Sequence, residues 1–177
     1  PLPYVDVKFS DEGEILVKNP CLMEGYFKEP EMTKETFTED GYLRTGDQGE
    51  EDKDGFLKIT GRVKDLFKTS KGKYVAPNPI ELQLSKDPTL EQICVAGSAL
   101  PQPIALVVLS EIGTSYSKDE LESNLKNTLE QVNASLDAHE RIKKIVIMKD
   151  DWTVENSILT PTMKIKRNVV DKTYQDR

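Results

Sequence analysis

The 177-residue sequence is poor in the residues that most often build metal centres and disulfide frameworks. It contains one histidine and two cysteines. Cys21 and Cys94 lie far apart and lack the short spacing of metal-binding pairs. We therefore expect buried or free thiols rather than a disulfide, in a reducing, cytosolic setting, and we assign no metal ligand.

Two further absences argue against whole classes of protein. No apolar run approaches the ~20 residues that span a bilayer, and residues 1–10 lack the basic region and apolar core of a secretory or transit segment. The net charge of −7 argues against a nucleic-acid partner. The chain begins at Pro1, without an initiator methionine, so we expect a piece of a longer protein. Peripheral association with the inner face of a membrane and the oligomeric state remain open.

The first third of the chain has the short, turn-punctuated segments of a β-rich region. Residues 4–18 alternate apolar and polar side chains around an Asp-Glu-Gly turn, which predicts a hairpin. A polar stretch with a short helix at 31–36 follows. Strands are then expected at 42–45 and 56–60, separated by the turn signal DKDG at 52–55. The pattern indicates a small antiparallel sheet or barrel.

The rest of the chain mixes strands with helices. A second hairpin is expected around residues 70–73. Asn78, Pro79 and Glu81 stand in the order of an N-cap, a first-turn proline and an N3 glutamate. A helix is therefore expected to begin at Pro79, and Pro88 is expected to end it.

Three apolar runs too short for helices predict buried strands at 92–98, 104–109 and 145–148. Residues 117–120 (SKDE) form a capping box, which predicts the start of a long helix. The apolar stripe of that helix is Leu121, Leu125, Leu129, Val132 and Leu136. A closing helix is expected at 165–174. The mixture indicates an α+β fold, a short sheet covered by helices.

Two polar residues follow glycines at points where ligands are often held. Gly46, at the expected end of the strand 42–45, is expected to let the chain turn sharply, and Asp47 follows it; Arg62 follows Gly61. A carboxylate at a strand end can accept hydrogen bonds from two neighbouring hydroxyls, as a ribose diol presents them. A planar guanidinium suits sugar or phosphate oxygens. Taken singly, such residues are more often turn formers and solvated charges.

Four segments, taken in order, carry a resemblance to a known family. They are residues 42–47 (YLRTGD), 61–65 (GRVKD), 70–75 (SKGKYV) and 160–167 (TPTMKIKR). Together they resemble motifs of the adenylate-forming enzymes, which include acyl-CoA synthetases, luciferases and peptide-synthetase adenylation domains. The resemblance is closest to the long-chain fatty acid–CoA ligases and extends over most of the chain.

The resemblance implies a fold of two parts. Residues 1–61 would be the C-terminal β-subdomain of a large N-terminal adenylation domain, present here as a β-rich remnant. Residues 65–177 would be the lid domain of the adenylate-forming superfamily, an α+β unit with a small three-stranded sheet and helices. The family's phosphate loop, acyl pocket and adenine-stacking aromatic would lie upstream of Pro1, so the chain alone is expected to be inactive as a ligase.

The resemblance also implies roles for three charged side chains. Lys164 matches the catalytic lysine, which stabilises charge on the carboxylate and the α-phosphate during adenylation. Met163 stands where many relatives have glycine, and in this departure the chain resembles the long-chain ligases. Whether Lys164 or Lys166 reaches the active site is open, although Lys164 matches better, and a basic first turn of a surface helix is the alternative. Asp47 and Arg62 match the residues that bind the ribose of ATP or AMP.

Two connecting segments have implied roles as well. Lys64 matches the hinge about which the lid rotates, since a few backbone positions can absorb a domain rotation. Lys71, Gly72 and Lys73 match the turn beside the channel for CoA, and the lysines suit an anionic cofactor. From spacing alone, Lys64 is a solvent-facing lysine in a connector. Residues 71–73 are then a plain hairpin turn in which Gly72 supplies a positive φ.

The function that the resemblance implies is that of an acid–thiol ligase. Such an enzyme joins a long-chain fatty acid to ATP, with Mg²⁺, to give acyl-adenylate and pyrophosphate, and CoA then displaces AMP. We recognise no Mg²⁺ ligand in this chain, and the expected partners are these small molecules. Two alternatives stay open: another adenylating enzyme, such as one that transfers the acyl group to a carrier-protein thiol, and a non-catalytic binding module with the lid fold.

Overall fold

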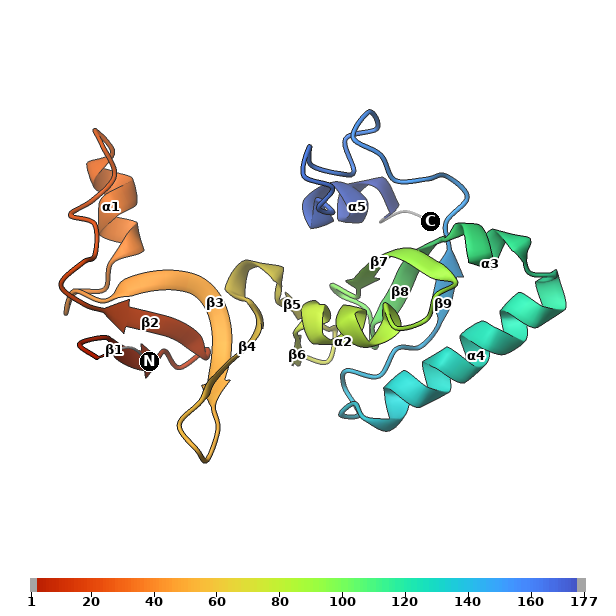
Figure 1. The fold of residues 1–177 in the computed structure, drawn as a ribbon, viewed down its shortest axis with the longest axis horizontal. Coiled ribbons are helices and arrows are strands. Elements are labelled where there is room, and N and C mark those ends of the chain that lie inside the picture. Colours follow the sequence, from red (N-terminus) through yellow and green to blue (C-terminus); the bar gives the residue numbers. More distant parts are fainter. Residues whose placement is uncertain (1–2, 175–177) are drawn as a thin grey trace. The chain divides into compact units, whose positions relative to one another are not determined.

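The computed structural model describes residues 3–174, and the chain divides into two compact units, 1–64 and 65–177. Figure 1 shows strands and one short helix in the first unit, and strands with several helices in the second. Among residues 3–174, no helix combines the length and apolarity needed to cross a membrane.

The first unit is an antiparallel sheet of four strands that lie in chain order (Figure 1). Its elements are β1 (Asp6–Phe9), β2 (Glu14–Lys18), α1 (Pro30–Thr36), β3 (Leu43–Glu51) and β4 (Leu57–Arg62). They confirm the hairpin and the short helix. The turn between β1 and β2 depends on Gly13, whose φ of +79° is left-handed and costs glycine little. Ile15 and Leu16 are buried on β2.

The strand expected at 42–45 continues through Gly46, so the sharp turn expected there is wrong. Gly46 has a φ of +72° and lies within β3, where the chain bulges instead of leaving the sheet. The pairing of β3 with β2 shifts register between Glu14 and Leu16. A bulge of this kind re-aims the side chains that follow it, and Asp47 therefore lies inside a strand rather than at its end.

The second unit combines a hairpin, a three-stranded sheet and helices. Its elements are η1 (Val63–Asp65), which crosses from the first unit, and then β5 (Phe67–Lys68), β6 (Tyr74–Val75), α2 (Pro77–Leu84), β7 (Leu90–Ala96), β8 (Ile104–Leu109), α3 (Glu111–Ser115), α4 (Lys118–Ala134), β9 (Ile145–Ile147) and α5 (Arg167–Tyr174). The hairpin, the three strands and the closing helix are confirmed. The short helix α3 was not expected from the sequence.

The three-stranded sheet is the middle layer of the second unit. β7 is antiparallel to β8, and β9 is parallel to β8 at the edge. Successive residues of β7 enter different cores: Val95 packs with the apolar residues of α2 and α4, and Cys94 packs with Trp152 and with Val170 of α5. The Ser117–Glu120 capping box and the α4 stripe from Leu121 to Val132 are confirmed, whereas Leu136 is buried in the same core but lies past the end of the helix. Helices therefore cover both faces of the sheet.

The expected start of α2 is wrong. The helix begins at Pro77 after Ala76, which gives no side-chain cap, and it ends at Leu84, before Pro88 is reached. The amide of Val95 donates to the Glu81 carboxylate, and the side chain of Asn78 accepts a hydrogen bond from Arg167. Long-range partners therefore replace the local cap that the sequence order suggested.

Candidate functional site

Asp47 and Arg62 lie directly opposite each other on β3 and β4. An Arg62 guanidinium nitrogen is 3.1 Å from Asp47 Oδ1, and the two side chains are 58% and 29% exposed. An ion pair this exposed contributes only about 0–1 kcal/mol to stability. A ligand with hydroxyls or phosphate oxygens could therefore replace the contact at little cost, and the pair offers both an acceptor and a planar set of donors.

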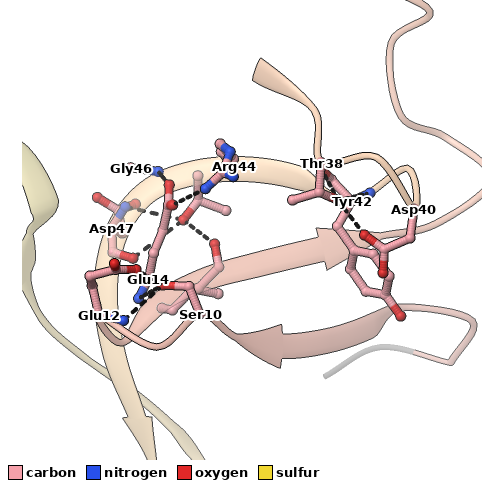
Figure 2. Close-up of polar contacts among 11 residues, drawn as sticks. Ser10, Glu12, Glu14, Thr38, Asp40, Tyr42, Arg44, Gly46 and Asp47 are labelled. Atoms are coloured by element: carbon pink, nitrogen blue, oxygen red, sulfur yellow. Dashed lines mark hydrogen bonds and ion pairs between the residues drawn. The ribbon is translucent and has the colours of Figure 1, made fainter. Parts of the chain in front are cut away.

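The bulge before Asp47 is held by a buried carboxylate that the sequence interpretation missed. Glu14, on β2, is 8% exposed. Figure 2 shows its carboxylate between Arg44 and Gly46: Arg44 lies 3.1 Å from Oε2, and the Gly46 amide donates to Oε1 at 3.0 Å. The Thr45 hydroxyl accepts from the Asp47 amide at 3.1 Å. These contacts fix the backbone that presents Asp47. An acidic residue in the apolar run EILVK was the available signal.

A second polar cluster fixes the entry to β3, and Figure 2 shows three of its members, Thr38, Asp40 and Tyr42. The Tyr42 hydroxyl donates to Asp6 at 2.5 Å, and Lys8 lies 4.1 Å from the centre of the Tyr42 ring. Hydrogen bonds from Lys8 and Thr38 lower the pKa of Asp40 to about 2. The segment that leads into the motif YLRTGD is therefore tied to β1 by charged and aromatic contacts.

Lys64 is exposed and is the last residue of the first unit. It lies in the single 3₁₀ turn η1, between β4 and the hairpin of the second unit. The expected hinge position thus coincides with the boundary between the two units. One short turn is the kind of segment in which a few dihedral changes reorient a domain.

Lys71, Gly72 and Lys73 form the exposed tip of the β5–β6 hairpin. Gly72 has a φ of +78°, as the turn interpretation required. The base of the hairpin is closed by the Thr69 amide, which donates to the Lys73 carbonyl at 2.9 Å. The two lysines project as unpaired cations from an ordered turn, because no ion pair involves them among residues 3–174.

Lys164 lies in an ordered loop of residues 160–166, called the lysine loop below. The Lys164 amide donates to the Thr160 hydroxyl at 3.0 Å, and the Lys164 carbonyl accepts from the Thr160 amide at 2.8 Å. Met163 has a φ of +61°, the left-handed conformation that glycine adopts more cheaply. Leu159 pairs with Ile165 in an isolated bridge at the base. The loop holds the backbone of Lys164 and leaves its side chain exposed.

The structure thus brings Asp47 and Arg62 together in the first unit and places Lys164 and the hairpin lysines in the second, with Lys64 at the boundary. Sequence reasoning gave no separate role to Arg167, the last residue of the motif 160–167 and the first of α5, which forms an ion pair with Glu81. Burial opposes its charge, but the hydrogen bond and charge of Glu81 outweigh that effect and raise the pKa of Arg167. Asn78 and Glu81 were available as signals, but they were assigned to a helix cap.

Mg²⁺ would need several oxygen ligands, which for this ion are chiefly carboxylates and phosphates. Among residues 3–174, no three His, Cys, Asp or Glu side chains converge as a metal site. Asp47, the carboxylate assigned to the candidate ribose site, already pairs with Arg62. The described residues therefore do not by themselves form a site for this ion.

Comparison with protein families gives one match over most of the chain. The sequence profile of the AMP-binding enzyme C-terminal domain matches residues 64–177. Long-chain-fatty-acid–CoA ligase FadD15 of Mycobacterium tuberculosis is 35% identical over 98% of this chain and 32% of its own length. Long-chain-fatty-acid–CoA ligase 5 of Mus musculus is 35% identical over 94% of this chain and 27% of its length. The chain spans about a third of the length of these curated relatives.

Solved structures with the same fold include adenylation domains. The adenylation domain of a carboxylate reductase from Mycobacterium chelonae superposes with a TM-score of 0.83, at 28% identity, over 99% of this chain and 30% of that one. The corresponding domain from Segniliparus rugosus, in complex with AMP and a co-purified carboxylic acid, gives a TM-score of 0.80 at 27% identity, over 100% of this chain and 31% of that one. The mixed α/β fold is that of the adenylate-forming superfamily.

Proposed function

Because this chain belongs to the AMP-binding enzymes, whose C-terminal domain it contains, we propose that it is part of a long-chain fatty acid–CoA ligase. In this proposal the complete enzyme joins a fatty acid to ATP and then transfers the acyl group to CoA. Curated relatives with that name support the proposal at about a third of their length. Because the chain spans only part of the length of these relatives, we expect it to be inactive as a ligase on its own.

The observation that carries the proposal is the open Asp47–Arg62 pair on its rigid bulge. Asp47 accepts hydrogen bonds from the ribose hydroxyls of ATP, and Arg62 donates to sugar or phosphate oxygens. Glu14 keeps the bulge in place without facing the ligand, since its two carboxylate oxygens accept hydrogen bonds from Arg44 and from the Gly46 amide. The nucleotide is thus held by residues whose own pairing costs little to break.

Lys164 supplies positive charge to the reacting carboxylate and α-phosphate during adenylation. The ordered lysine loop favours such a role, because a backbone already held in place reduces the reorganisation needed to bring the Lys164 ammonium to the developing charge. Lys64 is the hinge that carries the second unit from the adenylating pose to the thioester-forming pose. Lys71, Gly72 and Lys73 border the path of CoA, whose phosphates the two exposed lysines attract.

Transfer to the thiol of a carrier protein is the second candidate, and a specific observation favours it. One structural relative, from Segniliparus rugosus, is a didomain of an adenylation domain and a PCP domain of carboxylic acid reductase. It superposes with a TM-score of 0.78, at 30% identity, over 93% of this chain and 24% of that one. The two candidates share the adenylation step and differ only in the acceptor.

The test uses the complete enzyme that contains this chain. ATP–pyrophosphate exchange that depends on palmitate, followed by formation of palmitoyl-CoA, is the expected result. Exchange without thioester formation on CoA, but with loading of a pantetheinylated carrier domain, would favour the second candidate. Absence of exchange with palmitate or with shorter carboxylic acids would contradict both.

A further inference from the structure

The lysine loop is followed directly by an arginine whose charged side chain is largely enclosed by the protein. Arg167 follows the loop as the first residue of α5, and its side chain is 22% exposed. A positive charge in the first turn of a helix is opposed by the helix dipole. Burial opposes it as well, since the guanidinium must give up water. Partners within the fold must offset both costs.

Those partners come from three separate elements. The Arg167 guanidinium donates to Glu81 Oε2 at 2.5 Å and to Asn78 Oδ1 at 3.0 Å, both on α2. It also donates to the carbonyl of Val95 on β7 at 3.3 Å, and its Nε lies 3.8 Å from Asp65 Oδ1 in η1. A planar fork of donors can meet all these acceptors at once, which the single ammonium of lysine cannot do.

Glu81 is itself held in place, so the contact is not a loose surface pair. Its carboxylate is 17% exposed, and its second oxygen, Oε1, accepts from the amide of Val95 at 2.7 Å. The two oxygens of one carboxylate therefore join β7 to the guanidinium. Hydrogen bonds that use both oxygens of an enclosed carboxylate fix its orientation.

The hydrogen bonds of the lysine loop itself are local, although its Ile165 packs against the apolar cluster that includes Cys94 of β7 and Leu106 of β8. Its turn is closed by bonds between Thr160 and Lys164, and its base by the Lys166 amide, which donates to the Ile158 carbonyl at 2.8 Å. These bonds shape the loop but tie it only to the segment beside it. Arg167, three residues after Lys164, ties the loop by polar contacts to α2, β7 and the boundary residue Asp65.

We propose that Arg167 is a positioning residue that fixes the lysine loop within the second unit, so that Lys164 moves with that unit as a rigid part of it. The proposal rests on the proposed function, in which Lys164 acts during adenylation. Its contact with Asp65 joins the anchor to the residue that follows the hinge. A rotation at Lys64 is thereby transmitted to the loop through side-chain contacts as well as through the sheet.

The first test is structural and uses the 177-residue chain. In the Arg167→Lys variant, amide hydrogen exchange of Lys164 and Lys166 should accelerate at least tenfold, while exchange in β7 and β8 stays unchanged. Arg141→Lys is the matched control, because Arg141 is exposed and its side chain makes one hydrogen bond among residues 3–174, to the Leu136 carbonyl. Unchanged exchange in the lysine loop, or equal acceleration throughout the second unit, would overturn the proposal.

The second test is a double-mutant cycle in the complete enzyme, which measures adenylation and thioester formation separately. A displacement of about 1 Å in a catalytic group can cost about 100-fold in rate. Arg167→Lys should therefore lower the adenylation rate by about 10- to 100-fold, with the KM for ATP unchanged and the thioester step retained. In a Lys164→Ala background it should cause no further loss, since the group that it positions is gone.

The outcomes separate the two proposals. If Arg167→Lys causes the same loss with and without Lys164, the positioning role is overturned while the proposed function stands. A loss shared equally by both half-reactions also overturns it, because it indicates a merely structural role. If Lys164→Ala itself adenylates normally, the proposed function of Lys164 fails, and the positioning role for catalysis fails with it.

Discussion

At the scale of single residues, the candidate nucleotide site contains an exposed pair of charged side chains and a buried carboxylate that supports them. Asp47 and Arg62 are partly open to solvent, and among residues 3–174 the only ion pair of either side chain joins them across two strands. Glu14 is buried and is used entirely inside the sheet. Loss of Asp47 should therefore change binding with little effect on folding, whereas loss of Glu14 should disturb the fold as well.

Asp47→Ala in the complete enzyme should weaken ATP binding by about 1–3 kcal/mol, the usual cost of leaving the hydroxyls of a bound ribose without their acceptor. Its effect on the free energy of unfolding should be small, because an exposed ion pair contributes little. Asp54→Ala, in the exposed turn between β3 and β4, is the matched control. Calorimetric titration with ATP measures the difference. An unchanged affinity for ATP would mean that Asp47 only shapes the bulge in β3 and does not bind the ribose.

The two cysteines should differ sharply in reactivity. Cys21 is exposed, whereas Cys94 is 1% exposed, and burial raises the pKa of its thiol to about 12 against a smaller lowering by Arg167. The thiolate is the reactive form, so an aromatic disulfide reagent at pH 8 should titrate one thiol in the native chain and two in denaturant. Two thiols reacting at equal rates in the native chain would contradict this burial.

At the scale of elements, the second unit depends on a buried carboxylate between α2 and α4. Asp87 is 7% exposed. It accepts hydrogen bonds from Thr128 and Asn124 of α4 at 2.5 and 2.8 Å, and from the amide and hydroxyl of Thr89. Burial raises the pKa of Asp87, but these hydrogen bonds outweigh it, so the net pKa lies below the usual value.

Asp87→Asn should lower the free energy of unfolding by about 1–3 kcal/mol near neutral pH, since it places an amide donor against two donors. A lowered folded-state pKa stabilises the protein above the unfolded-state pKa, and this contribution is lost as the pH falls through the folded-state value. The difference between wild type and variant should therefore shrink below about pH 4, which is near the ordinary pKa of aspartate. Urea unfolding, followed by the helical circular dichroism signal, measures it.

The exposed Asp150 supplies the matched control for that experiment. Asp150→Asn should leave both the free energy of unfolding and its pH dependence close to the wild type. A pH-independent difference for Asp87→Asn would mean that Asp87 does not titrate below its usual range.

The elements also show where sequence reasoning succeeds. The Ser117–Glu120 capping box is confirmed because donor and acceptor lie within one turn of the same helix. The apolar stripe of α4 follows the helical period, and the strands β7 and β8 follow continuous apolar runs, so local sequence predicts their burial. Short-range patterns of this kind depend on neighbours that the sequence displays directly.

The failures have a common physical cause. Asn78 and Glu81 read as a helix cap, but their side chains contact Arg167, which lies more than 80 residues away. Gly46 reads as a turn, but a carboxylate on another strand, Glu14, holds it inside β3. The motifs singled out Asp47 and Arg62, which the structure pairs across β3 and β4, and their role in ribose binding stays a prediction. The supporting residues of this candidate site could not be predicted, because long-range contacts determine them.

At the scale of the whole molecule, the chain is two units joined by one 3₁₀ turn. The proposed cycle requires the second unit to take two positions, so the turn at Lys64 must change its dihedral angles. Lys64→Pro in the complete enzyme fixes φ at that position. Thioester formation should then fall more than adenylation in separate assays of the two half-reactions. Equal losses in both would remove the hinge assignment.

The central claim is that Lys164 acts in the first half-reaction and not in the second. Lys164→Ala in the complete enzyme should reduce adenylation of the fatty acid by about 10²–10³-fold, as expected for loss of one preorganised charge at the reacting centre. Thioester formation from preformed acyl-adenylate and CoA should stay close to wild type, and Lys166→Ala should leave both steps intact. Normal adenylation by Lys164→Ala together with loss in Lys166→Ala would move the role to Lys166. Normal adenylation by both variants would contradict the account.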